Sequence, residues 1–433
     1  MISLREAREL VLAGCRPCPP RSVPLADALG LVLAEPVVAP HPVPPFTTSA
    51  MDGYAVRAAD TRPAPARLSV IGSVLAGSAP DVEVGPRQAV RIMTGAPLPE
   101  GADAVCMIEL TRPEGDGVVV VEEPVDEGRH VRRPGEDVVA GQLVFDAGEV
   151  LSPGHLGVLA SLGLYRAHAR ARPRVGVLST GDELVEGPEP LSPGKIRDAN
   201  RHSLLATLRR DGFDTCDLGI AGDDLGEITA RIAKGAEGCD ALVTSGGVSV
   251  GDVDYVKVAL DDLSGGTMRW MQVAIRPAKP LAFGNLAADG TPVFGLPGNP
   301  VSALVSYELF VRPGLRRMAG HAVLDRPLVT ARADEPLTRR PDGKVHFVRV
   351  RARFGPEGLL HVRSSGGQES HQLRAMAGAN ALAVLPDGQG VGAGDEVEVL
   401  LTDPADLGRG SPGTRAADLF ARLDEQADLA GAT

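Results

Sequence analysis

The spacing of apolar residues divides the chain into segments of different secondary structure. Ser3-Leu-Arg-Glu6 forms a capping box, and apolar residues follow it at helical spacing (Leu4, Ala7, Leu10 and Val11), so a helix is expected at the start. Residues 52–150 instead contain short runs of β-branched residues broken by Gly and Pro, which is typical of an all-β module. Its expected strands are 67–71, 88–92, 104–108 and 117–121, and a helix is expected over 151–164.

From Arg172 onward, short apolar runs alternate with amphipathic stretches. The expected strands are 174–179, 215–220, 241–244, 268–275 and 291–294, and the expected helices are 203–210, 225–236, 253–262 and 299–312. Asn299 is placed as the N-cap of the last helix, with Pro300 at its first position. The alternation predicts a doubly wound, mostly parallel sheet, with ligands at the carboxyl ends of its strands.

After Pro313 the pattern returns to strands, expected at 328–331, 345–353, 359–362, 381–385 and 396–401. They predict a small C-terminal β barrel or sandwich. A Gly/Pro-rich linker is expected over 403–413, and a loosely held helix over 415–429.

Composition narrows the possible functions. The 433 residues carry 44 Lys+Arg and 56 Asp+Glu, and 44 − 56 gives a net charge of −12, which argues against sequence-independent nucleic-acid binding. No uninterrupted apolar run is long enough to cross a membrane, and the charged first residues do not resemble a signal peptide, so a cytoplasmic location is expected. Five scattered cysteines, including the CxxC pair Cys15 and Cys18, are expected to be reduced thiols without a function.

Thr244-Ser-Gly-Gly-Val-Ser-Val-Gly-Asp252 follows a buried strand and leads into a helix. Its glycines allow backbone N–H groups to converge on an anion. A tight crossover loop without a ligand explains the same residues equally well, and no nucleotide-binding fingerprint is present.

Carboxylates follow three of the expected strands: Asp182 and Glu183, Asp223 and Asp224, and Asp252 and Asp254. Acidic groups beside a phosphate-binding loop are suited to a Mg²⁺ ion that bridges phosphate oxygens. Most surface carboxylates are only solvated charges or helix caps, and Asp224 is expected to cap the helix that begins at Leu225.

Arg276-Pro-Ala-Lys279 places two cations on a rigid loop, which favours anion binding over ordinary surface charge. Phe294–Pro300 turns a strand sharply into a helix, and the segments around Asp52, 91–97 and 132–137 look like turns when each is taken alone. The residues by themselves therefore indicate a multidomain α/β protein that handles a phosphorylated, Mg²⁺-bound anion.

Seven strings that occur in order along the chain carry a more specific resemblance. They are Ser49-Ala-Met-Asp-Gly-Tyr-Ala-Val56, Arg91-Ile-Met-Thr-Gly-Ala96, Gly135-Glu-Asp137, Ser179-Thr-Gly-Asp-Glu-Leu184, Gly194-Lys-Ile-Arg-Asp-Ala-Asn200, Ser245-Gly-Gly-Val-Ser-Val-Gly251 and Gly295-Leu-Pro-Gly-Asn-Pro-Val-Ser-Ala303. Together they closely resemble the molybdopterin molybdotransferase family, the molybdenum-inserting enzymes that include the C-terminal region of gephyrin.

The resemblance implies a molybdopterin-binding α/β domain flanked by an N-terminal extended and β module and by a C-terminal β-barrel-like domain. The implied boundaries are 1–50 with 138–171 for the extended N-terminal domain, 51–137 for the inserted β module, 172–318 for the α/β domain, 319–403 for the C-terminal domain and 404–433 for a tail. It further implies a homodimer, and molybdopterin adenylyltransferase as a further partner.

The implied reaction joins adenylylated molybdopterin and molybdate, its two substrates, to give molybdenum cofactor and AMP, with Mg²⁺ as cofactor. The catalytic residues implied are Asp52, Thr94, Asp137, Glu183 and Asp254. The implied metal ligands are Asp182, Glu183, Asp223 and Asp254. The implied contacts to the bound molecules are Ser179, Thr180, Gly181, Ser245, Gly246, Gly247, Ser249, Gly251, Arg276, Lys279, Pro297, Gly298, Asn299, Arg349 and Ser370.

One position departs from the family pattern. Gln272 stands where many members have Lys, and the lost charge is expected to affect molybdate affinity. Two alternative functions are a molybdopterin adenylyltransferase that acts on ATP and a non-enzymatic binding scaffold. The flanking β modules argue against the first, and the lack of a fused anchoring domain argues against the second.

Overall fold

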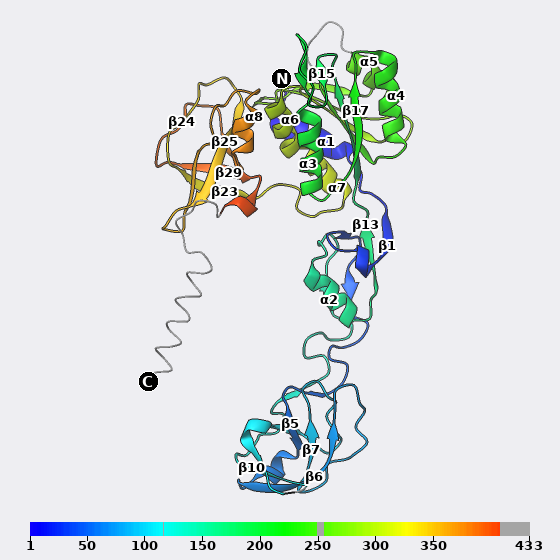
Figure 1. Cartoon of the computed structure of the whole chain (residues 1–433), viewed down its shortest axis with the longest axis vertical. Helices are drawn as coiled ribbons and strands as arrows, with labels where there is room; N and C mark the ends of the chain where they lie inside the picture. Colours follow the sequence, from blue (N-terminus) through cyan, green and yellow to red (C-terminus); the bar gives the residue numbers. More distant parts are fainter. Residues whose placement is uncertain (116, 249–254, 408–433) are drawn as a thin grey trace. The chain divides into compact units, whose positions relative to one another are not determined.

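The computed structural model describes residues 1–115, 117–248 and 255–407 (Figure 1). The chain forms two compact units, one made of residues 22–169 and the other of residues 1–21 together with the chain from Arg170 onward. The helix expected over 415–429 lies outside the described residues, as does most of the expected linker.

The unit of residues 22–169 consists mainly of short strands. They are β1 (Pro20–Pro24), β2 (Val32–Leu33), β3 (Val37–Val38), β4 (Thr48–Ser49), β5 (Gly53–Val56), β6 (Ala66–Val74), β7 (Gln88–Ile92), β8 (Ala104–Met107), β9 (Thr111–Pro113), β10 (Val118–Val121), β11 (Val131–Arg132), β12 (Leu143–Phe145) and β13 (Arg166–Arg170). Its helices are α2 (Pro153–Ser161) and three 3₁₀ turns, η1 (Leu25–Asp27), η2 (Ala58–Thr61) and η3 (Ile108–Leu110).

Six of these strands form the expected β module, in the order β8-β5-β7-β6-β10-β9. All four residues of β5 are buried, because apolar side chains pack on both faces of this sheet. The smaller sheets are β1-β13-β2, β11-β4 and β12-β3.

The second unit contains the expected α/β domain. Its strands are β14 (Arg174–Thr180), β15 (Leu184–Val185), β16 (Ile196–Arg197), β17 (Asp214–Ala221), β18 (Ala241–Ser245), β19 (Arg269–Gln272), β20 (Ile275–Arg276), β21 (Pro280–Asn285) and β22 (Pro292–Leu296). The main sheet has the order β17-β14-β18-β22-β21-β19. Its first four strands are parallel and the last two pair antiparallel, so the expected mostly parallel sheet is confirmed.

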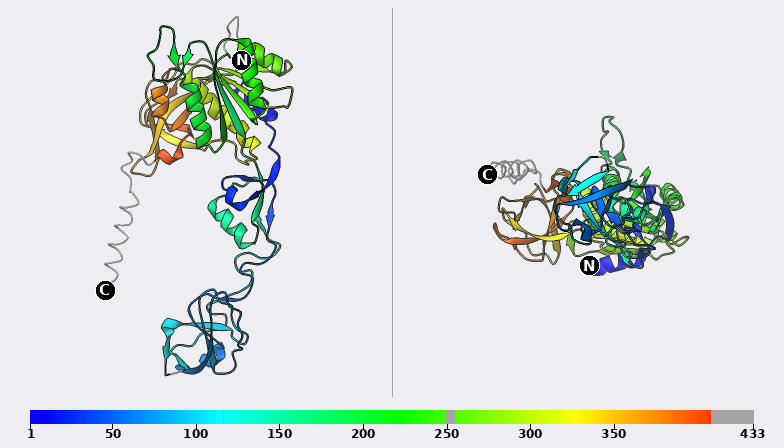
Figure 2. Two further views of the ribbon diagram at one scale, coloured as in Figure 1. Left: turned by 45° about the vertical axis from the view of Figure 1, so that its right-hand side comes forward. Right: turned by 90° about the horizontal axis from the view of Figure 1, so that it is seen from below.

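Helices cover both faces of this sheet (Figures 1 and 2). They are α1 (Leu4–Gly14), α3 (Asn200–Arg210), α4 (Leu225–Ala236), α5 (Tyr255–Leu263), α6 (Pro300–Ser306) and α7 (Arg312–Met318). Side chains of α1, α3, α6 and α7 share one core, and those of α4 and α5 share another. In the described residues, no helix is both long and apolar enough to cross a membrane.

The N-terminal helix begins as expected, because the Ser3 side chain accepts a hydrogen bond from the Glu6 N–H. Ala7 and Val11 are buried, but Leu10 is 41% exposed, so its expected place on the buried face is wrong. Asp224 also caps its helix as expected, through a bond from the Glu227 N–H.

The helix expected to end at Arg312 continues to Met318 through a π-helical segment, η4 (Tyr307–Val311). Pro313 lacks an N–H, so it cannot donate to the Leu309 carbonyl four residues earlier. The Arg8 guanidinium of α1 donates to that carbonyl instead, at 2.7 Å. This contact, distant in sequence, allows the helix to pass the proline.

The C-terminal domain is a closed five-stranded barrel, which is one of the two forms, barrel or sandwich, that the strand pattern predicted. Its strands β25-β26-β23-β29-β27 follow in order, and a pairing of β25 with β27 closes the ring. The elements here are β23 (Leu328–Ala333), β24 (Leu337–Thr338), β25 (Val345–Phe354), β26 (Leu360–Ser364), α8 (Leu373–Ala377), β27 (Ala381–Leu385), β28 (Gly390–Val391), β29 (Glu396–Leu401) and η5 (Pro404–Asp406).

A buried ionic cluster connects the end of α3, the π-helical segment and the linker to the barrel. Arg326 of the linker donates to Asp211 at 2.7 Å and to Glu308 at 2.8 Å, and Arg312 lies 3.2 Å from Asp211. Burial alone would lower the pKa of Arg326, but its bonds and charge interactions with Glu308 and Asp211 raise it. Two buried cations and two buried carboxylates therefore compensate each other inside the unit, and the half-exposed Arg210 lies within ion-pair distance of both carboxylates.

Replacing one member should leave an uncompensated buried charge, because the remaining groups stay desolvated. We expect Arg326→Met to lower the free energy of unfolding by about 3 kcal/mol, measured by chemical denaturation. The matched control is Arg332→Met, on an exposed position of β23. Equal unfolding free energies for the two variants would contradict a stabilising role for the cluster.

Candidate functional site

The loops after the parallel strands surround a cavity of about 580 Å³. Its lining is Thr180, Gly181, Glu183, Ile196, Asp223, Gly246, Gly247, Val248, Tyr255, Val256, Pro280, Pro297, Gly298 and Asn299. Nine of these were predicted from the sequence: Thr180, Gly181, Glu183, Asp223, Gly246, Gly247, Pro297, Gly298 and Asn299. A cavity of this size is typical of a small-molecule site.

Ser179, Asp182 and Ser245, which were also predicted, are not among the described residues that line the cavity. Ser179 and Ser245 are buried at the C-terminal ends of strands β14 and β18. Ser249, Gly251 and Asp254 lie outside the described residues. Asn299 precedes α6 as expected, but its side chain makes no capping hydrogen bond.

Two glycines allow the loops to approach one another. Gly246 has φ +102°, and a Cβ there would lie 2.8 Å from the Thr180 carbonyl oxygen. Gly298 lies on the other loop, where a Cβ would make only an ordinary van der Waals contact with the Gly246 Cα, at 3.9 Å. A larger residue at Gly246 would be strained and would also push the neighbouring strand end away.

Asn200 holds these loops at that separation. Its Nδ2 donates to the Ser245 hydroxyl and to the Gly298 carbonyl, both at 2.7 Å. Asp198 accepts bonds from the Ser179 hydroxyl at 3.0 Å and from the buried Arg201 at 2.9 Å. The sequence signal was the string Gly194–Asn200, which was recognised but assigned no role.

Two predicted metal ligands lie side by side at the ends of β14 and β17. The Asp223 N–H donates to Asp182 at 3.0 Å, and the Asp182 N–H lies 3.4 Å from an oxygen of Asp223. The carboxylate of Glu183 folds back toward Gly181. In the described part of the chain, no three His, Cys, Asp or Glu side chains form a ready metal-binding group, and Asp254 lies outside that part.

A second cavity of about 330 Å³ lies where the α/β domain meets the barrel. It brings together the predicted residues Arg276, Lys279 and Ser370 and adds Ser302 and Lys344, which sequence reasoning missed. The α/β domain and the barrel meet here because β20 pairs in parallel with β25 of the barrel, with Arg276 opposite His346. Pro280 lines both this cavity and the larger one, so the two adjoin.

Arg349 and Gln272 are not among the described residues that line the 330 Å³ cavity, although Arg349 lines a cavity of about 410 Å³ that adjoins it. Arg349 is fully buried, and its Nη2 donates to the carbonyls of Gly367 and Glu369 at 2.8 and 3.2 Å. It therefore holds the loop that carries Ser370. Gln272 lies on the edge strand β19, and it is not one of the described residues that line this cavity.

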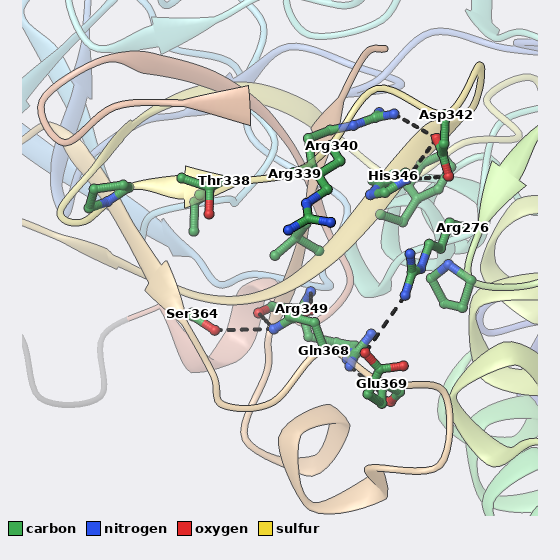
Figure 3. A pocket seen from close by; sticks show the side chains of 15 residues that line it. Arg276, Thr338, Arg339, Arg340, Asp342, His346, Arg349, Ser364, Gln368 and Glu369 are labelled. Atoms are coloured by element: carbon green, nitrogen blue, oxygen red, sulfur yellow. Dashed lines mark hydrogen bonds and ion pairs between the residues drawn. The ribbon is translucent and has the colours of Figure 1, made fainter. Parts of the chain in front are cut away.

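A third cavity of about 410 Å³ lies beside the second, at the end of the barrel (Figure 3). Arg276, Pro277, Gln368 and Glu369 line both. Figure 3 shows Arg276 and Glu369 directed toward each other at one side of it.

In the other unit, the predicted catalytic residues Asp52 and Thr94 contact each other, a pairing that the sequence did not predict. One oxygen of Asp52 accepts the Thr94 N–H at 2.7 Å and the Thr94 hydroxyl at 2.8 Å. These two bonds, with a weaker contribution from the charge of Arg91, lower the pKa of Asp52. Gly53 must be glycine, because a Cβ there would lie 1.9 Å from the Cys106 carbonyl oxygen. Asp137 lies on the loop after β11, where its N–H donates to the Val43 carbonyl at 3.0 Å.

The Asp52–Thr94 pair can be tested by titration. Thr94→Val removes the hydroxyl donor and keeps the backbone donor, so we expect the pKa of Asp52 to rise part of the way toward its ordinary value. Stabilisation from a lowered carboxyl pKa is present above the unfolded-state pKa and is lost as the pH falls through the folded-state pKa.

The measurement is a carbon NMR titration of the Asp52 carboxyl group. Thr111→Val, which removes a hydroxyl bonded to the Ile108 carbonyl in the same module, is the control. An unchanged Asp52 pKa in Thr94→Val would contradict the assigned bond.

Comparisons with known proteins cover almost all of the described chain. Three family models match in order: the MoeA N-terminal region (domains I and II) over residues 2–163, a probable molybdopterin binding domain over 176–317, and the MoeA C-terminal region (domain IV) over 330–402.

Whole-length relatives agree with these matches. Molybdopterin molybdenumtransferase 2 of Mycobacterium tuberculosis is 41% identical over 408 residues, covering 92% of this chain and 99% of that protein. Molybdopterin molybdenumtransferase of Haemophilus influenzae is 37% identical over 402 residues, covering 92% and 98%. The crystal structure of the molybdopterin biosynthesis MoeA protein of Pyrococcus horikoshii superposes with a TM-score of 0.77 at 30% identity, covering 93% of this chain and 100% of that one. The chain therefore belongs to the MoeA family of molybdopterin molybdenumtransferases.

Proposed function

We propose that this enzyme inserts molybdenum from molybdate into adenylylated molybdopterin and releases AMP. The observation that carries the proposal is the sharing of Pro280 by the 580 Å³ and 330 Å³ cavities. The larger cavity suits a pterin with its phosphates, and the smaller suits a tetrahedral oxyanion. Because they adjoin, one bound substrate lies next to the other, as the transfer requires.

The larger cavity takes the adenylylated substrate. Its Gly246 and Gly247 loop presents backbone rather than side chains, which suits phosphate oxygens. Asn200 keeps the glycine loops apart by a fixed distance, so the cavity is formed before the substrate binds. Holding the phosphoanhydride in one orientation is the main contribution of this lining.

The carboxylates at the strand ends fit a divalent cation. Glu183 and Asp223 line the cavity, and Asp182 lies beside Asp223, so hard oxygen donors are gathered at the phosphate side. Glu183, Asp182 and Asp223 would hold Mg²⁺, with Asp254 as a further ligand. When bound, Mg²⁺ supplies neutralisation of the negative charge that develops on the phosphates as AMP leaves.

The smaller cavity takes molybdate. Arg276, Lys279 and Lys344 supply positive charge, and Ser302 and Ser370 supply hydroxyl donors. In the described part of the chain, Lys279 forms no ion pair, whereas Lys344 donates to Asp342 at 2.8 Å. Arg349 is a positioning residue, because it fixes the backbone next to Ser370.

We also propose a homodimer with shared sites. Large apolar side chains of the 22–169 unit are exposed to solvent: Leu29, Val38, Val139, Leu143, Val150 and Tyr165, at 40–69%. Val38 and Leu143 lie opposite each other on β3 and β12, and an exposed apolar patch of this kind favours a partner surface. In an isologous dimer, Asp52 and Thr94 of one chain complete the site formed by Glu183 and the glycine loops of the other. Molybdopterin adenylyltransferase is the further partner proposed, because it makes the adenylylated substrate.

The reaction can be tested with purified chain, adenylylated molybdopterin and molybdate. We expect molybdate-dependent release of AMP, and we expect Glu183→Gln to lower its rate at least about a hundredfold, since charge neutralisation at phosphate is worth several kcal/mol. Glu237→Gln, on the exposed end of α4, is the matched control. AMP release by Glu183→Gln at the control rate would rule out the assigned role of Glu183.

The shared site can be tested by mixing two inactive variants. Asp52→Ala and Glu183→Gln are co-expressed, so that about half of the dimers are mixed, and each mixed dimer has one intact site if sites are shared. About a quarter of the wild-type activity should then return. Activity at the single-variant background, with mixed dimers verified by two different tags, would contradict a shared site.

A further inference from the structure

Glu369 places a negative charge in a cavity otherwise suited to anions. Among the described residues that line the 330 Å³ cavity, it is the only carboxylate, beside Arg276, Lys279 and Lys344. Three cations and one carboxylate give a formal charge of 3 − 1 = +2 for this lining. A carboxylate is unfavourable next to a bound dianion, so its place here requires an explanation.

The Glu369 side chain interacts with the central cation of the cavity. Its Oε1 lies 3.7 Å from Nη2 of Arg276, and Figure 3 shows the two side chains directed toward each other. The two side chains are 63% and 55% exposed, so water screens the pair and makes it weak. An incoming anion with two charges can therefore displace the carboxylate from Arg276.

The backbone around Glu369 is held firmly while its side chain is not. The Glu369 N–H donates to the Gln372 side chain at 2.9 Å, and its carbonyl accepts from the buried Arg349 at 3.2 Å. The Ser370 carbonyl accepts the Val301 N–H at 3.1 Å, which fastens the loop to the α/β domain. The carboxylate can thus rotate away from Arg276 without moving Ser370.

We propose that Glu369 is an internal competitor for Arg276 and sets the oxyanion affinity of the enzyme. This inference rests on the proposed molybdate site. In the empty cavity the carboxylate pairs with Arg276, and a tetrahedral oxyanion dianion binds by replacing it. The competitor weakens binding of every anion of this class, so that the cavity takes up and exchanges its oxyanion instead of retaining it.

The test is direct titration of molybdate into the full chain by calorimetry, without any pterin. We expect Glu369→Gln, which keeps the side-chain size and removes the charge, to bind molybdate about three- to tenfold more tightly than wild type. Glu369→Ala should change affinity in the same direction. Glu357→Gln, on the same barrel but outside the cavity lining, should leave the affinity unchanged.

A second pair of variants separates this inference from the proposed function. Arg276→Gln should weaken molybdate binding, and Glu369→Gln added to Arg276→Gln should give a smaller gain than it gives in wild type, since the competed pair is gone. Turnover should change in parallel, with a lower KM for molybdate in Glu369→Gln and little change in kcat.

The contrary outcomes are distinct. Glu369→Gln that binds molybdate no better than wild type, while Arg276→Gln weakens binding, would overturn the competitor and leave the molybdate site in place. Arg276→Gln that binds as wild type does, or an absence of binding in both wild type and Glu369→Gln, would overturn the anion site itself.

Discussion

The cavity at the sheet edge depends on one short-range constraint, the close approach of two glycine loops joined by Asn200. A single side-chain amide donates to Ser245 at the end of β18 and to Gly298 after β22. These strands are neighbours in the parallel sheet, so the amide joins their ends on the ligand side. Any side chain at Gly246 would contact Thr180 on the third strand. The width of the cavity is therefore set by backbone contacts and one amide, all of which exist without a ligand.

Close to this cavity, the positive charge of Arg201 is buried, and it is tolerated there because carboxylates pair with it. Arg201 is almost completely buried and has Asp198, Asp217 and Glu186 as partners. Burial alone would lower the pKa of Arg201, but these hydrogen bonds raise it, so the cation is held in place. Asp198 in turn bonds to Ser179 at the end of β14. This ionic network thus orients the end of β14. None of its residues lines the larger cavity, so the loops that do remain available for ligand contacts.

Much of the fold followed from local patterns, and the misses have specific physical causes. Helix 225–236 and strands 381–385 and 396–401 have the bounds that the sequence pattern predicted, because the helix and the last strand bury one regular face and strand 381–385 is a short apolar run buried on both faces. Strand β21 was missed because it begins with Pro280 and contains Gly284, which resemble turn signals. The helix through Pro313 was cut short because its compensation comes from Arg8, about 300 residues away in sequence. In the site, Arg276 and Lys279 were found from one string, whereas Lys344 joins them only through the pairing of β20 with β25, and Ser302 joins them from helix α6.

That pairing makes the barrel part of the site. Lys344, Glu369 and Ser370 all belong to the barrel, whereas Arg276, Lys279 and Ser302 belong to the α/β domain. An α/β domain alone would keep the larger cavity, since all of its lining comes from residues 180–299, but it would lose four of the seven polar or charged residues that line the smaller one: Lys344, Gln368, Glu369 and Ser370. With the larger cavity as the proposed site of the adenylylated pterin, adenylylation needs only that cavity. Capture of an oxyanion beside it needs the second set of groups as well, so the presence of the barrel favours molybdenum transfer over adenylyl transfer for this chain.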